Sequence, residues 1–88
     1  MKVKDCFVLR QVVDTWVVMP LGQASVDFNG MLTLNDAGAL LWKCLEKDVS
    51  REDLADALTA EYEVTRETAL ADADAFLEKL TEAGCLEL

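Results

Sequence analysis

The hydrophobic pattern of the chain changes period near its middle, between Leu34 and Asp36. Before this point the apolar residues gather in short runs rich in valine, leucine and aromatic side chains, as is typical of β-strands. After it they recur every three or four residues, as is typical of helices that bury one face. Strands followed by helices predict an α+β fold, with helices packed on one face of an antiparallel sheet.

Two apolar runs open the predicted sheet. They are "CFVLRQV" (residues 6–12) and "TWVVMPL" (residues 15–21), and the "VDT" between them suits a turn. An antiparallel pair of strands is therefore expected here. With the strand described next, the sheet has three strands, or four if residues 24–28 pair regularly.

The stretch "SVDFNGMLTL" predicts a further hairpin. Asn29-Gly30 fits a two-residue type I′ turn, because both residues tolerate a positive φ. In the arm after the turn, Leu32 and Leu34 share one face of the strand, and Met31 and Thr33 share the other.

The second half of the chain predicts three helices. The first begins at a cap formed by Asn35 or Asp36 and runs to about Lys47. Trp42 lies off the centre of its apolar face, so we expect it to pack against the sheet or a neighbouring helix. The apolar face consists of Ala37, Leu40, Leu41, Cys44 and Leu45.

The other two helices have local start signals. Residues 50–62 begin with Ser50 and, three residues later, Asp53, a variant of the capping box. Residues 66–83 follow Thr65 as a cap and stop at Gly84. The buried positions predicted for the two helices are Leu54, Leu58 and Tyr62, and Leu70, Ala73, Phe76, Leu77 and Leu80.

Three helices beside a small sheet give a winged helix-turn-helix-like composition. One option for the final "CLEL" is a return beside the sheet. The chain has 88 residues, of which 52% are hydrophobic, enough for the core of one domain over residues 1–88 and too few for two.

Charge excludes one class of partner. The net charge is −9, and all of it lies in residues 44–88, which carry four bases and thirteen acids. A nucleic-acid-binding domain should have a basic face, and this half of the chain would repel a phosphate backbone. Neither an apolar run long enough to span a bilayer nor a signal peptide is visible, so no membrane partner is expected.

Reactive residues are scarce. There is no histidine, and the three cysteines (Cys6, Cys44 and Cys85) are far apart in sequence, so we expect reduced thiols in the cytoplasm, with neither a disulfide framework nor a zinc site. Pairs such as Asp72 with Asp74, or Asp53 with Glu61, could be imagined as metal ligands, but the solvated faces of helices explain them better. We expect no catalysis and no cofactor. Trp16 and Trp42 suit the core better than a ligand.

The strand "MLTL" (residues 31–34) has no charge and no proline, so it lacks the usual protection of a sheet edge. Two interpretations remain open. Residues 24–28, a helix or a second copy of the chain could cover it, or it could accept an extended peptide as an added strand.

A set of spaced residues gives the chain a family resemblance: Leu34-Asn35, Gly38-Ala39, Leu41-Trp42, Leu45, Leu54, Leu58, Tyr62, Phe76-Leu77, Leu80 and Gly84. Over nearly the whole chain, this set resembles the PqqD-like family, also known as the RiPP recognition element. Relative to the founding members, "GQASVDFN" is an extra segment, which indicates a related subgroup.

The resemblance implies a non-catalytic adaptor that binds the leader region of a ribosomally made precursor peptide and presents it to a modifying enzyme, often a radical SAM protein. It implies that the leader adds a strand to the last strand of the sheet and that the third helix forms the other wall. Some of these residues, namely Leu32, Leu70, Ala73 and Leu77, could instead be plain core. The implied contacts are the main chain of Met31, Leu32, Thr33 and Leu34 and the side chains of Arg66, Leu70, Ala73, Asp74 and Leu77.

Two alternatives differ in their partner. A winged-helix DNA-binding regulator would need bases on its second and third helices, which carry mostly acids. A structural homodimer would pair the "MLTL" edge with itself across a two-fold axis. The expected assembly is a monomer or a weak homodimer.

Overall fold

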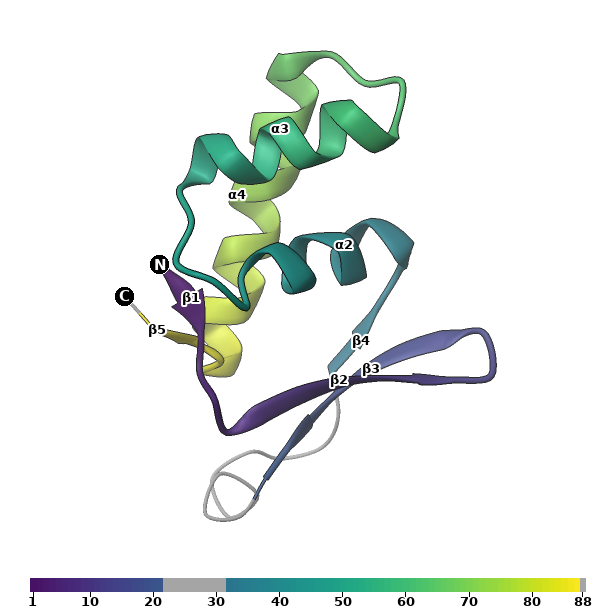
Figure 1. Cartoon of the computed structure of the whole chain (residues 1–88), viewed down its shortest axis with the longest axis vertical. Helices are drawn as coiled ribbons and strands as arrows, with labels where there is room; N and C mark the ends of the chain where they lie inside the picture. Colours follow the sequence, from purple (N-terminus) through teal and green to yellow (C-terminus); the bar gives the residue numbers. More distant parts are fainter. Residues whose placement is uncertain (22–31, 88) are drawn as a thin grey trace.

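A computed structural model describes residues 1–21 and 32–87, and these residues form an antiparallel sheet beside three helices (Figure 1). The three-stranded sheet contains β2 (Phe7–Val12), β3 (Thr15–Pro20) and β4 (Leu32–Leu34), in that order across the sheet. The α+β fold class predicted from the sequence is confirmed. The predicted turn at Asn29-Gly30, the possible strand over residues 24–28 and Met31 lie outside the described residues.

The register of the sheet places β4 at one edge. β2 and β3 form a hairpin in which Val12 faces Thr15 across a two-residue turn. β4 pairs with β3 through three facing positions, with Thr33 opposite Val17 at the centre. Thr33 is exposed and Leu34 is buried, as the predicted alternation of faces requires.

The helices are α2 (Asp36–Cys44), α3 (Arg51–Glu61) and α4 (Arg66–Ala83). α2 ends before the predicted boundary at Lys47. The backbone N–H groups of Glu46 and Lys47 bond to carbonyls three residues back, at 3.3 Å each, so the chain leaves the α-helix through a tighter turn.

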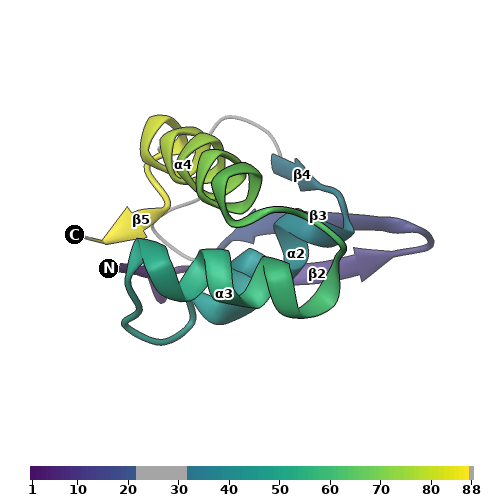
Figure 2. The same cartoon turned by 90° about the horizontal axis from the view of Figure 1, so that it is seen from above.

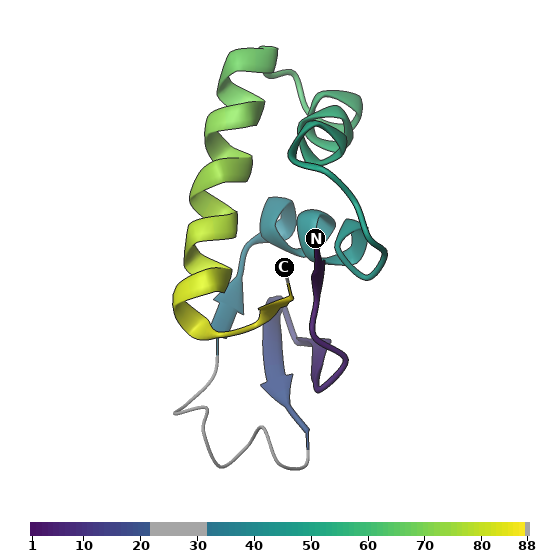
Figure 3. The same ribbon diagram turned by 90° about the vertical axis from the view of Figure 1, so that its left-hand side faces the viewer.

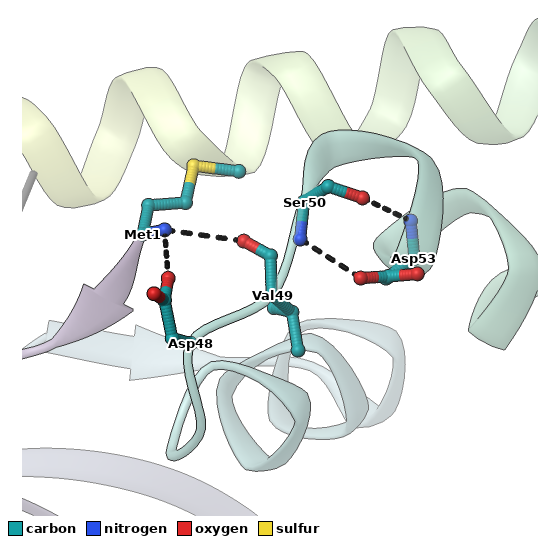
Figure 4. A network of polar contacts seen from close by, with 5 residues as sticks. All are labelled: Met1, Asp48, Val49, Ser50 and Asp53. Atoms are coloured by element: carbon teal, nitrogen blue, oxygen red, sulfur yellow. Dashed lines mark hydrogen bonds and ion pairs between the residues drawn. The ribbon is translucent and has the colours of Figure 1, made fainter.

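The predicted caps are present. Asn35 is the cap of α2, and its side chain accepts a hydrogen bond of 2.8 Å from the N–H of Gly38. At the start of α3, Ser50 and Asp53 exchange the two bonds of a capping box (Figure 4). Thr65 caps α4, and Gly84 ends it with a φ of 75°.

The core lies between the sheet and the helices. Trp42 is 1% exposed, which confirms its assignment to the core, while Tyr62 is 40% exposed. The prediction of Tyr62 as a buried helical residue was wrong, because α3 ends at Glu61 and Tyr62 has an extended backbone. The largest fully buried side chains are those of Trp42, Leu45, Leu54, Leu80, Val18 and Cys85.

The two ends of the chain form a second, smaller sheet. β1 (Lys2–Val3) pairs with β5 (Leu86–Glu87), so the final segment returns beside β1 and not beside β4 (Figure 3). The ammonium group of Met1 contacts the carboxylate of Asp48 and the carbonyl of Val49 (Figure 4), which ties β1 to the segment between α2 and α3. In the described part of the chain, no helix is long and apolar enough to cross a membrane.

Candidate functional site

Within residues 1–21 and 32–87, the outer side of β4 is an open sheet edge. One side of β4 is paired with β3, and no other strand of the described residues 1–21 and 32–87 pairs with its other side. Figures 2 and 3 show α4 on this same side, so the edge runs beside a helix. A strand in this position has main-chain donors and acceptors on the side that no described strand pairs with.

The main-chain groups of Thr33 face the outer side of β4. The Nζ atom of Lys79, on α4, donates a hydrogen bond to the Thr33 carbonyl oxygen at 3.3 Å. The carbonyl therefore points toward α4 and away from β3. Because the N–H and C=O of one strand residue point to the same side, Thr33 offers both a donor and an acceptor at the open edge.

A pocket of about 350 Å³ adjoins the end of β4. We call it the β4–α4 pocket. Its apolar side chains are largely buried, and those of Leu41 and Leu58 are 2% and 3% exposed. The pocket is lined by Leu34, Asn35, Ala37, Gly38, Leu41, Leu58, Asp72, Ala75, Phe76 and Lys79.

The rim of the pocket has one charge of each sign. Asp72 and Lys79 are both exposed and lie seven residues apart on α4, with Ala75 between them. Seven residues are two helical turns, so the two Cα atoms are about 10 Å apart along the helix axis. The site can thus take an apolar side chain and distinguish the charges on either side of it.

The α4 residues that the family resemblance implied lie outside the β4–α4 pocket. Arg66 forms an ion pair with Asp56 of α3. Asp74 accepts hydrogen bonds from Arg51 of α3, with 2.8 Å between Nη2 and Oδ2, and this contact lowers the pKa of the Asp74 carboxyl. Ala73 is fully buried in the core.

Leu70 and Leu77 are half-buried and pack against the core cluster. Residues 66, 70, 74 and 77 recur at helical spacing, and they share the face that meets α3 through Arg66 and Asp74. None of the five expected α4 residues lines the β4–α4 pocket. Peptide contact at these positions stays a prediction. A different set of α4 residues lines the pocket that adjoins β4: Asp72, Ala75, Phe76 and Lys79.

The sequence held a weak signal for this second set. Residues 72, 75, 76 and 79 also recur at helical spacing, on the other flank of the buried row that contains Ala73 and Leu80. Nothing local distinguishes the two flanks, except that one is more apolar. The apolar flank is the one that meets α3.

Trp16 has polar partners at the surface of β3. Its Nε1 donates to Asp36 at 3.1 Å, and the Nζ of Lys43 lies 4.4 Å from the centre of its ring. A cation–π contact of this kind covers one face of the indole. In this structure Trp16 thus links β3 to α2, which accounts for it without a stacked ligand.

The thiols and carboxylates make no reactive cluster in the described residues. All three cysteines are free, and burial raises the pKa of Cys85 to about 11. A thiol with a raised pKa is a poor nucleophile at neutral pH. No group of three or more metal-ligating side chains occurs in the described part of the chain.

A strand edge that no other described strand pairs with, a helix beside it and an apolar pocket together define a class of protein, the small domains that can accept an extended peptide as an added strand. A family model described as Coenzyme PQQ synthesis protein D (PqqD) matches residues 15–86. The chain belongs to the PqqD family, as its sequence resemblance predicted.

Two solved structures are similar over nearly the full length of both chains. One is TbiB1 in complex with the TbiA(beta) leader peptide, at 32% sequence identity and a TM-score of 0.79, covering 99% of this chain and 95% of that one. The other is lasso peptide synthetase B1 complexed with the leader peptide, at 30% identity and a TM-score of 0.75, covering 96% and 93%. No curated protein sequence matches at a significant level.

Proposed function

We propose that this protein is a non-catalytic, cytoplasmic adaptor that binds the leader region of a ribosomally made precursor peptide by strand addition to β4. It presents the rest of the precursor to a modifying enzyme. The observation that supports this best is the similarity, over more than nine-tenths of both chains, to two proteins whose structures contain a leader peptide.

The open edge of β4 supports the same proposal physically. Each main-chain bond to an added strand contributes about 0.5–1.5 kcal/mol net. One apolar side chain buried in the β4–α4 pocket contributes about 1.5–3 kcal/mol. After the entropy of association is subtracted, these contributions are consistent with affinity in the micromolar range or somewhat tighter. Affinity of that order suits an adaptor that must release its cargo.

The identity of the modifying enzyme is a separate question. The family resemblance suggested a radical SAM protein, whereas both similar structures are named as B1 proteins, one of them of a lasso peptide synthetase. At 30% and 32% identity this likeness favours a lasso peptide-forming enzyme as the partner. Genes beside this one that encode a short precursor and such an enzyme would support the assignment, and a radical SAM gene there would reverse it.

The direct test is a titration of 15N-labelled protein with the leader of the precursor encoded beside this gene. We expect chemical shift changes at residues 32–34 and at Asp72, Ala75 and Lys79. The amide signals of α3 residues such as Asp56 should change little. A spectrum that is unchanged at saturating leader would contradict the proposal.

A homodimer that pairs β4 with itself would use the same edge. Sedimentation velocity at micromolar concentration distinguishes this homodimer from the adaptor. The adaptor should sediment as a monomer that gains mass when the leader is added. A stable dimer that resists the leader would replace the adaptor proposal.

A further inference from the structure

Lys79 places a positive charge at the open edge of β4, where it contacts the Thr33 carbonyl. We propose that Lys79 recognises a carboxylate of the bound leader and that Lys79 and Asp72 together select the register of the leader in the β4–α4 pocket. This inference rests on the proposed function, and it adds the charge pattern of the peptide that the site prefers.

The charge environment distinguishes Lys79 from the arginines that join α3 and α4. Arg51 and Arg66 are already paired with carboxylates of neighbouring helices. Lys79 is exposed, its Nζ contacts a neutral carbonyl, and no ion pair in the described residues includes it. Its positive charge is therefore available to a ligand at the point where a ligand strand would dock.

Strand addition changes the partner of Lys79. An N–H group of the incoming strand that bonds to the Thr33 carbonyl competes with Lys79 for that oxygen. The ammonium group then lies beside the added strand, within reach of an acceptor on the peptide. A carboxylate on the peptide supplies one, and a charge-assisted bond is stronger than the bond to the neutral carbonyl that it replaces.

Asp72 makes the preference for a peptide carboxylate depend on its position along the rim of the pocket. It lies on the same rim about two helical turns toward the start of α4. A peptide carboxylate near Asp72 is repelled, while the same carboxylate near Lys79 is attracted. A slip of the peptide along β4 exchanges these contacts, so the pair of charges favours one register.

The net charge of the protein strengthens this preference. At −9 it repels acidic peptides in general. An acidic residue is thus disfavoured at most positions of a bound leader and favoured opposite Lys79. The preferred segment has an apolar side chain for the pocket and one acidic residue placed to meet Lys79.

A double-mutant cycle tests this inference. The protein variants are wild type and Lys79→Met, and the peptides are the leader used in the titration and versions with each acidic residue changed to its amide. We expect one amide change to weaken binding to wild type by about three- to fivefold, the range expected for a partly exposed ion pair. Lys79→Met should weaken binding of the natural leader equally, and the two changes together should cost no more than either alone.

Lys47→Met is the matched control, because Lys47 is exposed beyond the far end of α2 and its loss changes the net charge by the same amount. It should bind the natural leader as wild type does. Lys79→Arg should retain most of the affinity, and Lys79→Glu should prefer a leader whose acidic residue is changed to lysine. Thermal melts of every variant verify that it is folded.

The binding experiments distinguish a failure of the Lys79 inference from a failure of the adaptor proposal. If wild type binds the leader but the two losses add independently, or the bound segment has no carboxylate, this inference is wrong and the adaptor proposal stands. If wild type does not bind the leader at all, the adaptor proposal itself is wrong.

Discussion

Gly38 of α2 lies directly against the ring of Phe76 in α4. A Cβ atom at position 38 would come 3.3 Å from Cε1 of Phe76 and 3.2 Å from Cβ of Leu34, which is tighter than nine in ten real Cβ contacts. All three residues line the β4–α4 pocket. The absence of a side chain at position 38 therefore lets α2, α4 and β4 meet closely enough to form the floor of the pocket.

Gly38→Ala should lower the free energy of unfolding by about 1 kcal/mol. Crowding of a packed interior costs about 1–3 kcal/mol, and the better helix propensity of alanine offsets up to about 1 kcal/mol of it. Urea unfolding measures the change. The affinity for the leader should also fall, because the displaced side chains of Leu34 and Phe76 reshape the pocket.

Gly84→Ala separates the loss of stability from the change in the shape of the pocket. Gly84 has a φ of +75°, and nothing lies within 4 Å of a Cβ built there, so alanine costs about 1 kcal/mol through backbone strain alone. We expect a similar loss of stability with leader affinity unchanged. Equal losses of affinity in both variants, or a more stable Gly38→Ala, would show that the contact with Phe76 does not shape the site.

The sequence predicted the parts of the fold that local chemistry decides. The capping box of Ser50 and Asp53 and the helix over residues 66–83 depend on neighbours a few positions away, and both agree with the structure. The short β1 and β5 strands were not predicted as a pair, because two residues are too few to show a period and their pairing joins the ends of the chain.

The candidate site also has one part that local sequence predicts and one part that depends on long-range packing. The uncharged strand that contains Thr33 indicated an unprotected edge, but its composition left open whether another segment covers that edge or a peptide adds to it. Which flank of α4 lies beside that edge depends on where α3 packs, and this is a long-range contact. The family resemblance implied Leu70 and Leu77 as part of a groove wall, whereas in the structure Arg51 and Arg66 join α3 and α4 on that flank.

Thr33→Pro tests strand addition. The contact between Lys79 and the Thr33 carbonyl indicates that the Thr33 N–H also faces outward, so proline removes a donor to the guest strand without breaking the pairing with β3. We expect a folded protein with leader affinity reduced about tenfold, since one hydrogen bond contributes about 0.5–1.5 kcal/mol and the proline ring adds a clash. Isothermal titration calorimetry measures the affinity.

Thr33→Ala is the control, because it removes the exposed side chain and keeps the N–H. It should bind the leader nearly as wild type does. A folded Thr33→Pro with unchanged affinity would place the pairing edge elsewhere, and an unfolded one would mean that this N–H bonds to β3.

Alkaline pH should destabilise the protein through Cys85. Burial raises its pKa to about 11 in the folded state, from 9.0 for an ordinary thiol. Below pH 9 the thiol is protonated in both states, but between pH 9 and 11 only the unfolded state releases its proton, so stability falls as pH rises through this window. Cys85→Ala should flatten that part of a plot of stability against pH, as measured by urea unfolding. An equally steep fall in the variant would assign the effect to other groups.

Ala75→Phe should block the pocket. Ala75 is exposed on the rim, so a ring at this position can fill the space that a leader side chain would occupy. We expect binding to weaken by about tenfold or more, the equivalent of one lost apolar anchor. Stability should change by less than about 0.5 kcal/mol, as for most surface substitutions.

Ala60→Phe on α3 provides the comparison, because Ala60 is exposed and does not line the pocket. Fluorescence anisotropy with a labelled leader compares the two variants directly. Equal affinities would indicate that the leader does not enter the β4–α4 pocket.

Asp74→Asn distinguishes the two flanks of α4. Asp74 is held by Arg51, and this contact lowers the pKa of its carboxyl, so the ion pair favours the folded state above the ordinary pKa of 3.8 and loses that effect as pH falls below it. We therefore expect the asparagine variant to lose part of its acid sensitivity, with a small effect on stability at neutral pH because an exposed pair contributes little. It should bind the leader within about twofold of wild type, because Asp74 does not line the β4–α4 pocket. Titration of the leader against both proteins measures this difference. A large loss of affinity would place the peptide against the flank that contains Leu70 and Leu77, as the family resemblance implied.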